Sequence, residues 1–153
     1  MIIRNMSAKD KDNFLSMSDI FYSSEAALHG FDRSIQERNF TASLNNSPSI
    51  RCLMFEDECG TILGYAIICH SWSTELGGPI LLVEELYLKP QSRGHGHARE
   101  FFQWLFNEYE EKAVGFRLEV APANAQVMEV YRKYGFKPLE YLQMIRSLPS
   151  DTP

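Results

Sequence analysis

Long apolar runs are missing from this sequence. The longest, Ile80 to Leu88, contains two glutamates and falls far short of the ~20 residues that cross a bilayer as a helix. The opening residues, Met1 to Arg4, lack the layout of a signal peptide. These absences argue against a membrane-spanning helix, and they predict a cytoplasmic protein without a membrane partner.

Cysteine is scarce, and basic residues are not in excess. Cys52, Cys59 and Cys69 are odd in number and show no Cys-x-x-Cys spacing, so we expect buried thiols and neither a disulfide framework nor a zinc site. The net charge of −5 argues against a general nucleic-acid binder, because neutralising phosphates needs a basic face. An acidic protein can still bind an anion locally.

The length and composition are those of an ordinary globular domain. A chain of 153 residues can bury a core, and 44% apolar and 23% charged residues fit a soluble protein. We see no internal repeat, low-complexity segment or linker. A single domain over residues 1–148 is therefore expected, followed by a short C-terminal tail, 149–153.

Apolar periodicity predicts both strands and helices. Apolar and β-branched runs bounded by turn residues indicate strands, and apolar side chains three or four residues apart indicate helices. The expected strands are 2–4, 50–55, 61–70, 80–88, 115–120 and 140–148. The expected helices begin after Ser7, at Ser34 in a capping box, at His97 and at Asn124, and the last is closed by Gly135.

The order of these elements indicates an α/β (mixed α+β) fold. A hairpin in the first half, followed by strand-helix-strand-helix-strand, is typical of a mixed, mostly antiparallel central sheet with helices on its faces. A right-handed crossover would make the strands 80–88 and 115–120 parallel neighbours. The segment 23–32 has no clear period, and we expect a surface connection that could cover a substrate site.

A glycine-rich loop, Gln91 to Gly96, joins the 80–88 strand to the next helix. Such a loop makes an anion site, because free amides at the helix start point outward and the helix dipole favours negative charge. Gly94 and Gly96 let a ligand approach the backbone, Arg93 adds a positive charge, and the neighbouring histidines add donors. A pyrophosphate matches this loop.

Other interpretations of the loop are weaker. From the motif alone, the loop could equally be a simple turn without a ligand. A dinucleotide fingerprint needs a glycine where Arg99 stands, and a Walker loop needs a Gly-Lys-Ser/Thr ending that is absent. A metal site around His95 and His97 lacks a further ligand at recognisable spacing, so we expect no metal.

Around this loop the sequence resembles the GNAT superfamily of N-acetyltransferases. Its signature Gln/Arg-x-x-Gly-x-Gly/Ala is matched by Gln91, Gly94 and Gly96. A second block resembles the family's other cofactor motif: Asn124 is followed seven residues later by Tyr131 and then by a Gly-Phe pair. The two blocks have the family's order and separation and span roughly residues 81–139.

The resemblance implies an enzyme that uses acetyl-CoA as co-substrate. It implies a splayed parallel strand pair whose free backbone groups bind the pantetheine arm, while the loop amides hold the pyrophosphate. A homodimer is expected at the family level only. One departure is His97-Ala98, where members often carry a small apolar residue and glycine. The cofactor-binding residues expected by resemblance are Leu86, Tyr87, Leu88, Gln91, Arg93, Gly94, His95, Gly96, His97, Ala98 and Asn124.

Acetyl transfer to an amine needs a neutral nucleophile, a stabilised oxyanion and a proton for the leaving thiolate. Glu84 could take the amine's proton directly or through a water. Strand alternation would send Glu85 to the opposite face. By resemblance to polyamine-acetylating members we assign Glu84 as the base and Glu85 to substrate binding, although a carboxylate here could also bind without taking a proton.

The remaining roles follow from the resemblance. Tyr131 matches the family tyrosine that protonates the departing sulfur, with Tyr134 as a fallback, and its phenol is protonated at neutral pH. The oxyanion is expected on a backbone amide of the segment 86–88.

The acceptor stays open at this point. Glu25, Glu75, Glu84 and Glu85 would suit a cationic amine, yet acidic residues on a protein of net charge −5 are mostly solvated. Small polyamines, amino acids, aminoglycoside-like amines and peptide or protein amines all fit. The main alternative is a catalytically silent module that senses acyl-CoA.

Overall fold

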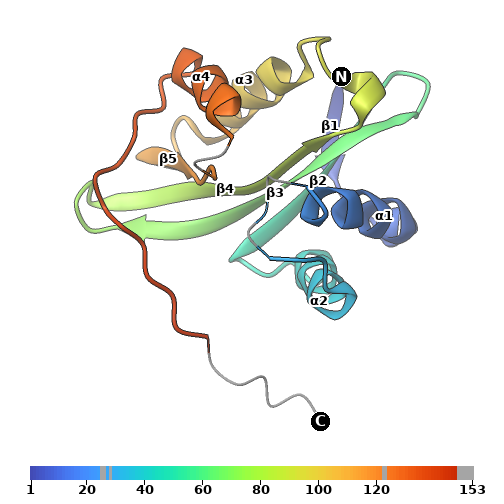
Figure 1. Ribbon diagram of the computed structural model, residues 1–153, viewed down its shortest axis with the longest axis horizontal. Coiled ribbons are helices and arrows are strands. Elements are labelled where there is room, and N and C mark those ends of the chain that lie inside the picture. Colours follow the sequence, from blue (N-terminus) through green and yellow to red (C-terminus); the bar gives the residue numbers. More distant parts are fainter. Residues whose placement is uncertain (25–26, 28, 122–123, 148–153) are drawn as a thin grey trace.

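The computed structural model describes residues 1–24, 27, 29–121 and 124–147. In this part of the chain, α1 and α2 cover one face of a five-stranded sheet, and α3 and α4 cover the other (Figure 1). This confirms the predicted mixed α/β fold. None of the described helices is long and apolar enough to span a membrane. The elements are β1 (Ile2–Asn5), η1 (Ala8–Asp10), α1 (Lys11–Tyr22), α2 (Arg33–Leu44), β2 (Ile50–Glu56), β3 (Ile62–Ser73), β4 (Gly78–Leu88), η2 (Pro90–Ser92), α3 (His97–Tyr109), β5 (Gly115–Leu118) and α4 (Ala125–Lys133).

The sheet has the strand order β1-β2-β3-β4-β5. The first three pairs are antiparallel, and β4 and β5 are parallel because the chain returns through α3. The parallel pairing extends only from Ile80 with Gly115 to Val83 with Leu118. Beyond Val83 no described residue pairs with this edge of β4. The two strands therefore separate at their carboxyl ends, which is the expected splay.

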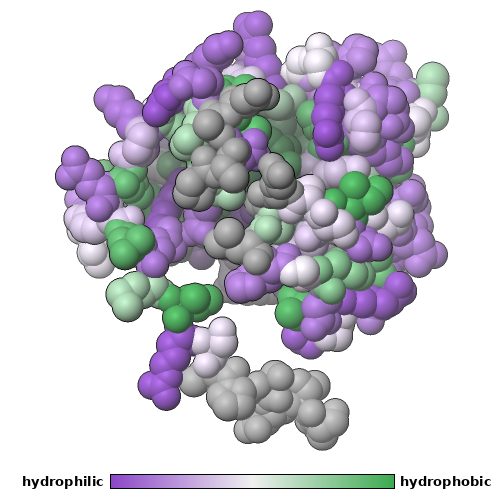
Figure 2. Space-filling view, in the orientation of Figure 1, coloured by the Kyte–Doolittle hydropathy of each residue, from purple (hydrophilic) through white to green (hydrophobic). Residues whose placement is uncertain are grey.

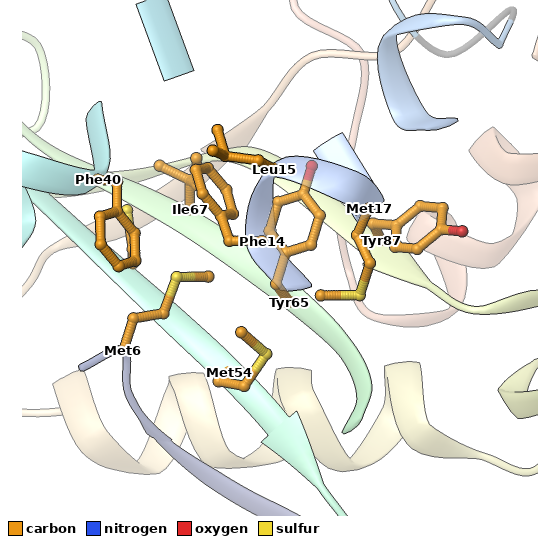
Figure 3. Packing of buried hydrophobic residues seen from close by; sticks show 10 residues of the cluster. Met6, Phe14, Leu15, Met17, Phe40, Met54, Tyr65, Ile67 and Tyr87 are labelled. Carbon is orange, nitrogen blue, oxygen red and sulfur yellow. The ribbon is translucent and has the colours of Figure 1, made fainter. Parts of the chain in front are cut away.

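Each face of the sheet has its own apolar core. Under α1 and α2, Phe14 stacks on Phe40 with ring centres 5.7 Å apart and meets Tyr65 edge to face at 5.2 Å. Figure 3 shows these rings with methionine side chains from the neighbouring elements. Under α3 and α4, Phe101 and Phe102 are fully buried. Burial on both faces fixes the register of β3 and β4, because a slip of one residue would exchange the two faces.

The helix ends follow the predicted signals with one correction. Asn124 is the N-cap of α4, and Gly135 has a φ of 87° after the last turn of that helix, as expected. In α2 the cap is Asp32 rather than Ser34, since the Asp32 carboxylate accepts hydrogen bonds from the amides of Ser34 at 2.8 Å and Ile35 at 3.3 Å.

The predicted last strand does not form. Residues 140–147 have no strand structure, and the end of that prediction, Leu148, lies outside the described residues together with the expected tail 149–153. Leu142, Met144 and Ile145 are 89%, 93% and 89% exposed, and Figure 2 shows apolar side chains of this segment outside the body of the molecule. Strand propensity becomes a strand only where the backbone finds a partner and the side chains find burial. This segment has neither.

The cysteines are less buried than predicted. Cys52 is buried and Cys69 half-buried, but Cys59 is exposed in the turn between β2 and β3. The Asp57 carboxylate accepts hydrogen bonds from the amides of Cys59 and Thr61 at 2.9 and 2.8 Å. This turn holds the Cys59 thiol at the surface.

Candidate functional site

β4 bulges where it separates from β5. In the β3–β4 ladder, Ile67 pairs with Glu85 and Ile68 pairs with Val83, so Glu84 is the extra residue. A bulge interrupts side-chain alternation and re-aims the side chains beside it. The acid pair therefore sits at the point where pairing with β5 ends.

Glu84 and Glu85 lie on the same face of the sheet. Burial, and then the charges of Glu84 and Glu85, raise the pKa of the Cys69 thiol to about 11. Burial and the same two carboxylates also raise the pKa of Tyr22, the last residue of α1. The geometry agrees, because Glu85 accepts a hydrogen bond from Tyr22 of α1. Val83 packs in the core under α3 and α4, so strand alternation turns the next residue, Glu84, to the α1 side. The expectation that alternation would send Glu85 to the opposite face is therefore wrong, because the bulge breaks the alternation.

Glu84 is the accessible member of the pair. Its side chain is exposed, and no described residue forms a hydrogen bond or ion pair with its carboxylate. Partial burial and then the charge of Glu119 raise its pKa, while Arg117 of β5 lowers it. A carboxylate with a raised pKa and a free lone pair has the properties of a proton acceptor near neutral pH.

Glu85 is buried and fully engaged. Its side chain is 5% exposed; Oε1 accepts a hydrogen bond from the Tyr22 hydroxyl at 2.8 Å and Oε2 accepts one from the Tyr65 hydroxyl at 2.6 Å. Burial raises the pKa of Glu85, the two phenols lower it, and the charge of Glu84 raises it further. Each carboxylate oxygen of Glu85 thus already has a protein donor.

The glycine loop has the backbone conformation of an anion site. Gly94 and Gly96 have φ angles of 78° and 86°, and Gly96 is the N-cap of α3. An added Cβ at either glycine would meet nothing within 4 Å, so the backbone is open to a ligand. The amides of 94–98 donate to no other described backbone group, whereas the Arg93 amide donates to the Pro90 carbonyl at 3.3 Å.

The charged side chains of the loop are held by local contacts. The Arg93 Nε donates to the Leu88 carbonyl at 3.0 Å, and its guanidinium lies 5.9 Å from the centre of the Tyr87 ring. His95 Nδ1 contacts the Arg93 carbonyl at 2.8 Å, and His97 Nδ1 contacts Glu100 at 3.3 Å. Gln91 is exposed and Ala98 half-buried. In the described chain, no group of three or more metal-ligating side chains is arranged around an ion.

Tyr131 lies on the opposite side of the sheet from the acid pair. Its ring packs edge-on against Phe102 of α3 at 5.9 Å and against Phe136 at 6.1 Å, in the core cluster that also contains Leu86 and Leu88. Burial raises the pKa of its phenol. Tyr134 joins the same cluster, with its ring 4.7 Å from Phe102. Asn124 makes no side-chain cap bond, so its amide side chain is not used by α4.

Tyr22 and Tyr65 were missed by the sequence interpretation. Helical spacing around Tyr22 indicates only an amphipathic helix, and its partner Glu85 is 63 residues away. A signal did exist, because two adjacent glutamates within an apolar strand need polar partners if either is buried. The Tyr87 hydroxyl is also buried and has no hydrogen-bond partner in the described chain.

Comparison with known proteins places the chain in a family. The family model for the Acetyltransferase (GNAT) family matches residues 14–136, which include the acid pair, the glycine loop and α4. The chain belongs to the GNAT acetyltransferases. No curated protein matches its sequence at a significant level.

Solved structures share the GNAT fold over nearly the whole chain. A possible acetyltransferase from Clostridium difficile 630 has a TM-score of 0.81 at 17% identity, covering 96% of this chain and 97% of that one. Ribosomal-protein-alanine N-acetyltransferase from Brucella melitensis biovar Abortus 2308 has a TM-score of 0.73 at 14% identity, with 97% and 100% covered. AAC(6')-Iy, in complex with the bisubstrate analog CoA-S-monomethyl-acetylneamine, has a TM-score of 0.73 at 15% identity, covering 96% of this chain and 97% of that one. At these identities the likeness concerns the fold alone.

Proposed function

We propose that this GNAT protein transfers an acetyl group from acetyl-CoA to a primary amine of a small molecule or peptide, by direct attack in a ternary complex. The observation that carries the proposal is the separation of β4 from β5 after Val83. The freed edge of β4 runs from the acid pair to the glycine loop, so one strand connects the groups that both substrates need.

The loop fits the pyrophosphate of acetyl-CoA. Its free amides at 94–98, the two glycines in the left-handed conformation and the Arg93 charge form a concave set of donors at the start of α3. We assign the pantetheine contacts to the backbone of Leu86–Leu88 and a further contact to Asn124. Acetyl-CoA bound there would supply the thioester carbon that the amine attacks.

Glu84 acts as the base in this proposal. An alkylammonium with a pKa near ~10.4 is mostly protonated at neutral pH, so its proton has to leave before attack. The exposed Glu84 carboxylate, with its raised pKa, accepts this proton directly or through a water. Its position on the α1 side supports an approach of the amine from that side.

Tyr131 acts as the acid, from the other face of β4. Its phenol is protonated at neutral pH and donates to the leaving thiolate. A backbone amide of Leu86–Leu88 stabilises the oxyanion. Base and acid on different faces of one strand suit a direct attack, because the amine nitrogen and the sulfur are separate substituents of the tetrahedral carbon and each needs its own proton-transfer group.

Thiol release from acetyl-CoA in the presence of a panel of amines tests this proposal. The panel contains propylamine, spermidine, an amino acid amide, neamine and a peptide with an N-terminal alanine, since relatives of this fold differ in acceptor. A blank that contains the protein but no amine corrects the measured thiol signal for the exposed Cys59. We expect amine-dependent release with at least one acceptor. Saturable binding of acetyl-CoA without release for any amine would instead support the silent sensor.

A further inference from the structure

The Glu85 carboxylate connects three elements of the fold. It sits on β4, accepts from Tyr65 of β3 at 2.6 Å, and accepts from Tyr22 at the end of α1 at 2.8 Å. Gln36 of α2, which is 2% exposed, also faces the Tyr22 hydroxyl. Figure 3 shows the Tyr65 hydroxyl directed toward α1. The end of α1 is thus attached to the β4 bulge by a part-buried, charge-assisted hydrogen bond.

Both phenols stay protonated, so both remain donors. Burial and the charge of Glu85 raise the pKa of Tyr22 and that of Tyr65 far above neutral pH. With each oxygen of Glu85 accepting one of these bonds and 5% of the residue exposed, little of the carboxylate is left for an incoming ammonium group. This argues against the direct substrate contact that the sequence suggested for Glu85.

Tyr22 lies between the buried and the exposed carboxylate. Its hydroxyl donates a hydrogen bond to Glu85, and the charge of Glu84 contributes to its raised pKa. The side chain is half-buried at the last position of α1. The chain leaves α1 immediately after this residue, so the side chain fixes the place where the helix ends beside the bulge. Removing its hydroxyl leaves a buried carboxylate oxygen unsatisfied, which costs free energy and loosens the helix end.

We propose that Glu85 is a positioning residue: through Tyr22 it fixes the end of α1 against the β4 bulge, and this sets the wall of the acceptor side next to Glu84. The inference rests on the proposed function, since it assigns the α1 face to the acceptor. It separates the acid pair into one accessible base and one buried anchor.

Tyr22→Phe is the direct test, because it removes one hydroxyl and keeps the ring. Tyr141→Phe is the matched control, since the Tyr141 hydroxyl donates to Glu75 at 2.6 Å in an exposed position outside the site. For Tyr22→Phe we expect KM for the amine to rise about tenfold, with KM for acetyl-CoA within about twofold of the wild type. The control should change neither constant. An unchanged amine KM in Tyr22→Phe, or an equal rise of both constants, overturns the proposal.

Hydrogen exchange gives a readout that does not depend on turnover. Amides 19–22, at the end of α1, should exchange at least tenfold faster in Tyr22→Phe than in the wild type and in Tyr141→Phe. If no amine supports thiol release, the proposed function fails. Hydrogen exchange still tests whether the Tyr22–Glu85 bond fixes the end of α1. Equal exchange in Tyr22→Phe and the wild type contradicts it.

Glu85→Gln separates an anchor from a substrate contact through the pH profile. The charged or titratable groups that act on Glu84 or share its surroundings are Glu85 on its own strand, Arg117 and Glu119 near β5, Tyr22 of α1 and Cys69 of β3. Glu85→Gln leaves Glu84, the base that sets the acidic limb of kcat/KM, in place, so the limb should persist and activity should be retained within about tenfold across the pH range. Loss of activity at every pH would mean that Glu85 binds the amine itself.

Discussion

Glu84 and Glu85 are consecutive residues of β4, and yet both lie on the face that α1 covers. The bulge opposite Ile67 and Ile68 produces this arrangement, and the next residues of β4 have lost β5 as a neighbour. Two carboxylates with different burial then share one region of the site. Their different surroundings are the basis for assigning them different roles.

The first prediction concerns Glu84→Gln. Near neutral pH the variant should lose about ten- to a thousandfold in kcat/KM, and the deficit should shrink as pH rises, because more amine is then already neutral. In the wild type, activity should fall as pH drops through the pKa of Glu84, and this limb should lie above the usual glutamate range because that pKa is raised. The measurement is kcat/KM against pH for both proteins.

Glu119→Gln is the control for the Glu84 prediction. Glu119 is exposed, and its charge contributes to the raised pKa of Glu84. Its removal should move the acidic limb to lower pH without loss of maximal activity. A deficit in Glu84→Gln that is constant across pH would assign Glu84 to substrate binding instead.

The second prediction concerns Tyr131→Phe. Turnover should fall by about ten- to a thousandfold, while the Kd for coenzyme A stays within about twofold, as for the loss of a general acid. Tyr134→Phe is the matched variant, since both rings pack on Phe102. Steady-state kinetics of both variants checks this. If only Tyr134→Phe loses turnover, the acid is Tyr134 and the assignment of Tyr131 is wrong.

Features set by residues next to them in the sequence could be predicted, and features set by contacts between distant segments could not. The glycine loop and the ends of α4 were predictable, because residues such as Gly96, Asn124 and Gly135 act on the backbone next to them. The bulge at Glu84 was not, since it arises from the register between β3 and β4. Alternation was assumed to continue through the strand, and this put Glu85 on the wrong face.

Two further misses have the same physical origin. The bond between Tyr22 and Glu85 joins residues far apart in sequence, and nothing near Tyr22 indicates it. The segment 140–147 has the apolar pattern of a strand, but a strand also needs a neighbouring edge, which a pattern does not specify. Glu25, one of the acidic residues considered for a cationic acceptor, lies outside the described residues.

The third prediction uses Gly96→Ala. Gly96 has a φ of 86° and open space around its Cβ position, so the cost comes from backbone strain of about 1–2 kcal/mol rather than from a clash. Gly60→Ala is the matched control, with a φ of 83°, equally open space and a place in the remote β2–β3 turn. Both variants should lose similar stability in chemical denaturation. Only Gly96→Ala should weaken coenzyme A binding. Equal binding by both variants would show that the loop is not part of the coenzyme A site.

The fourth prediction concerns acid stability. Arg4 donates to both oxygens of Asp10 at 2.8 and 2.9 Å, and the Ser7 amide donates to the same carboxylate at 2.7 Å. Burial alone would raise the pKa of Asp10, but these bonds outweigh it and lower the pKa to about 2. The interaction therefore stabilises the folded protein above about pH 4, by about 2 kcal/mol, and is lost as pH falls toward 2.

Asp10→Asn tests the acid-stability prediction. Its free energy of unfolding at pH 7 should be about 2 kcal/mol lower than that of the wild type, and the difference should shrink as pH falls toward 2. Asp12→Asn, on the exposed side of the neighbouring helix, should behave like the wild type. Urea denaturation between pH 2 and 7 measures this, and a pH-independent difference for Asp10→Asn would contradict the role of its charge.

The central claim is that free main-chain amides at 94–98 bind a diphosphate beside the separated edge of β4. Calorimetric titration of the protein with coenzyme A tests it most directly, with Gly60→Ala and Gly96→Ala measured in parallel. The account predicts saturable one-to-one binding in the wild type and in Gly60→Ala, and an affinity at least about tenfold weaker in Gly96→Ala. Absence of saturable heat in the wild type, or the same affinity in all three proteins, would contradict it.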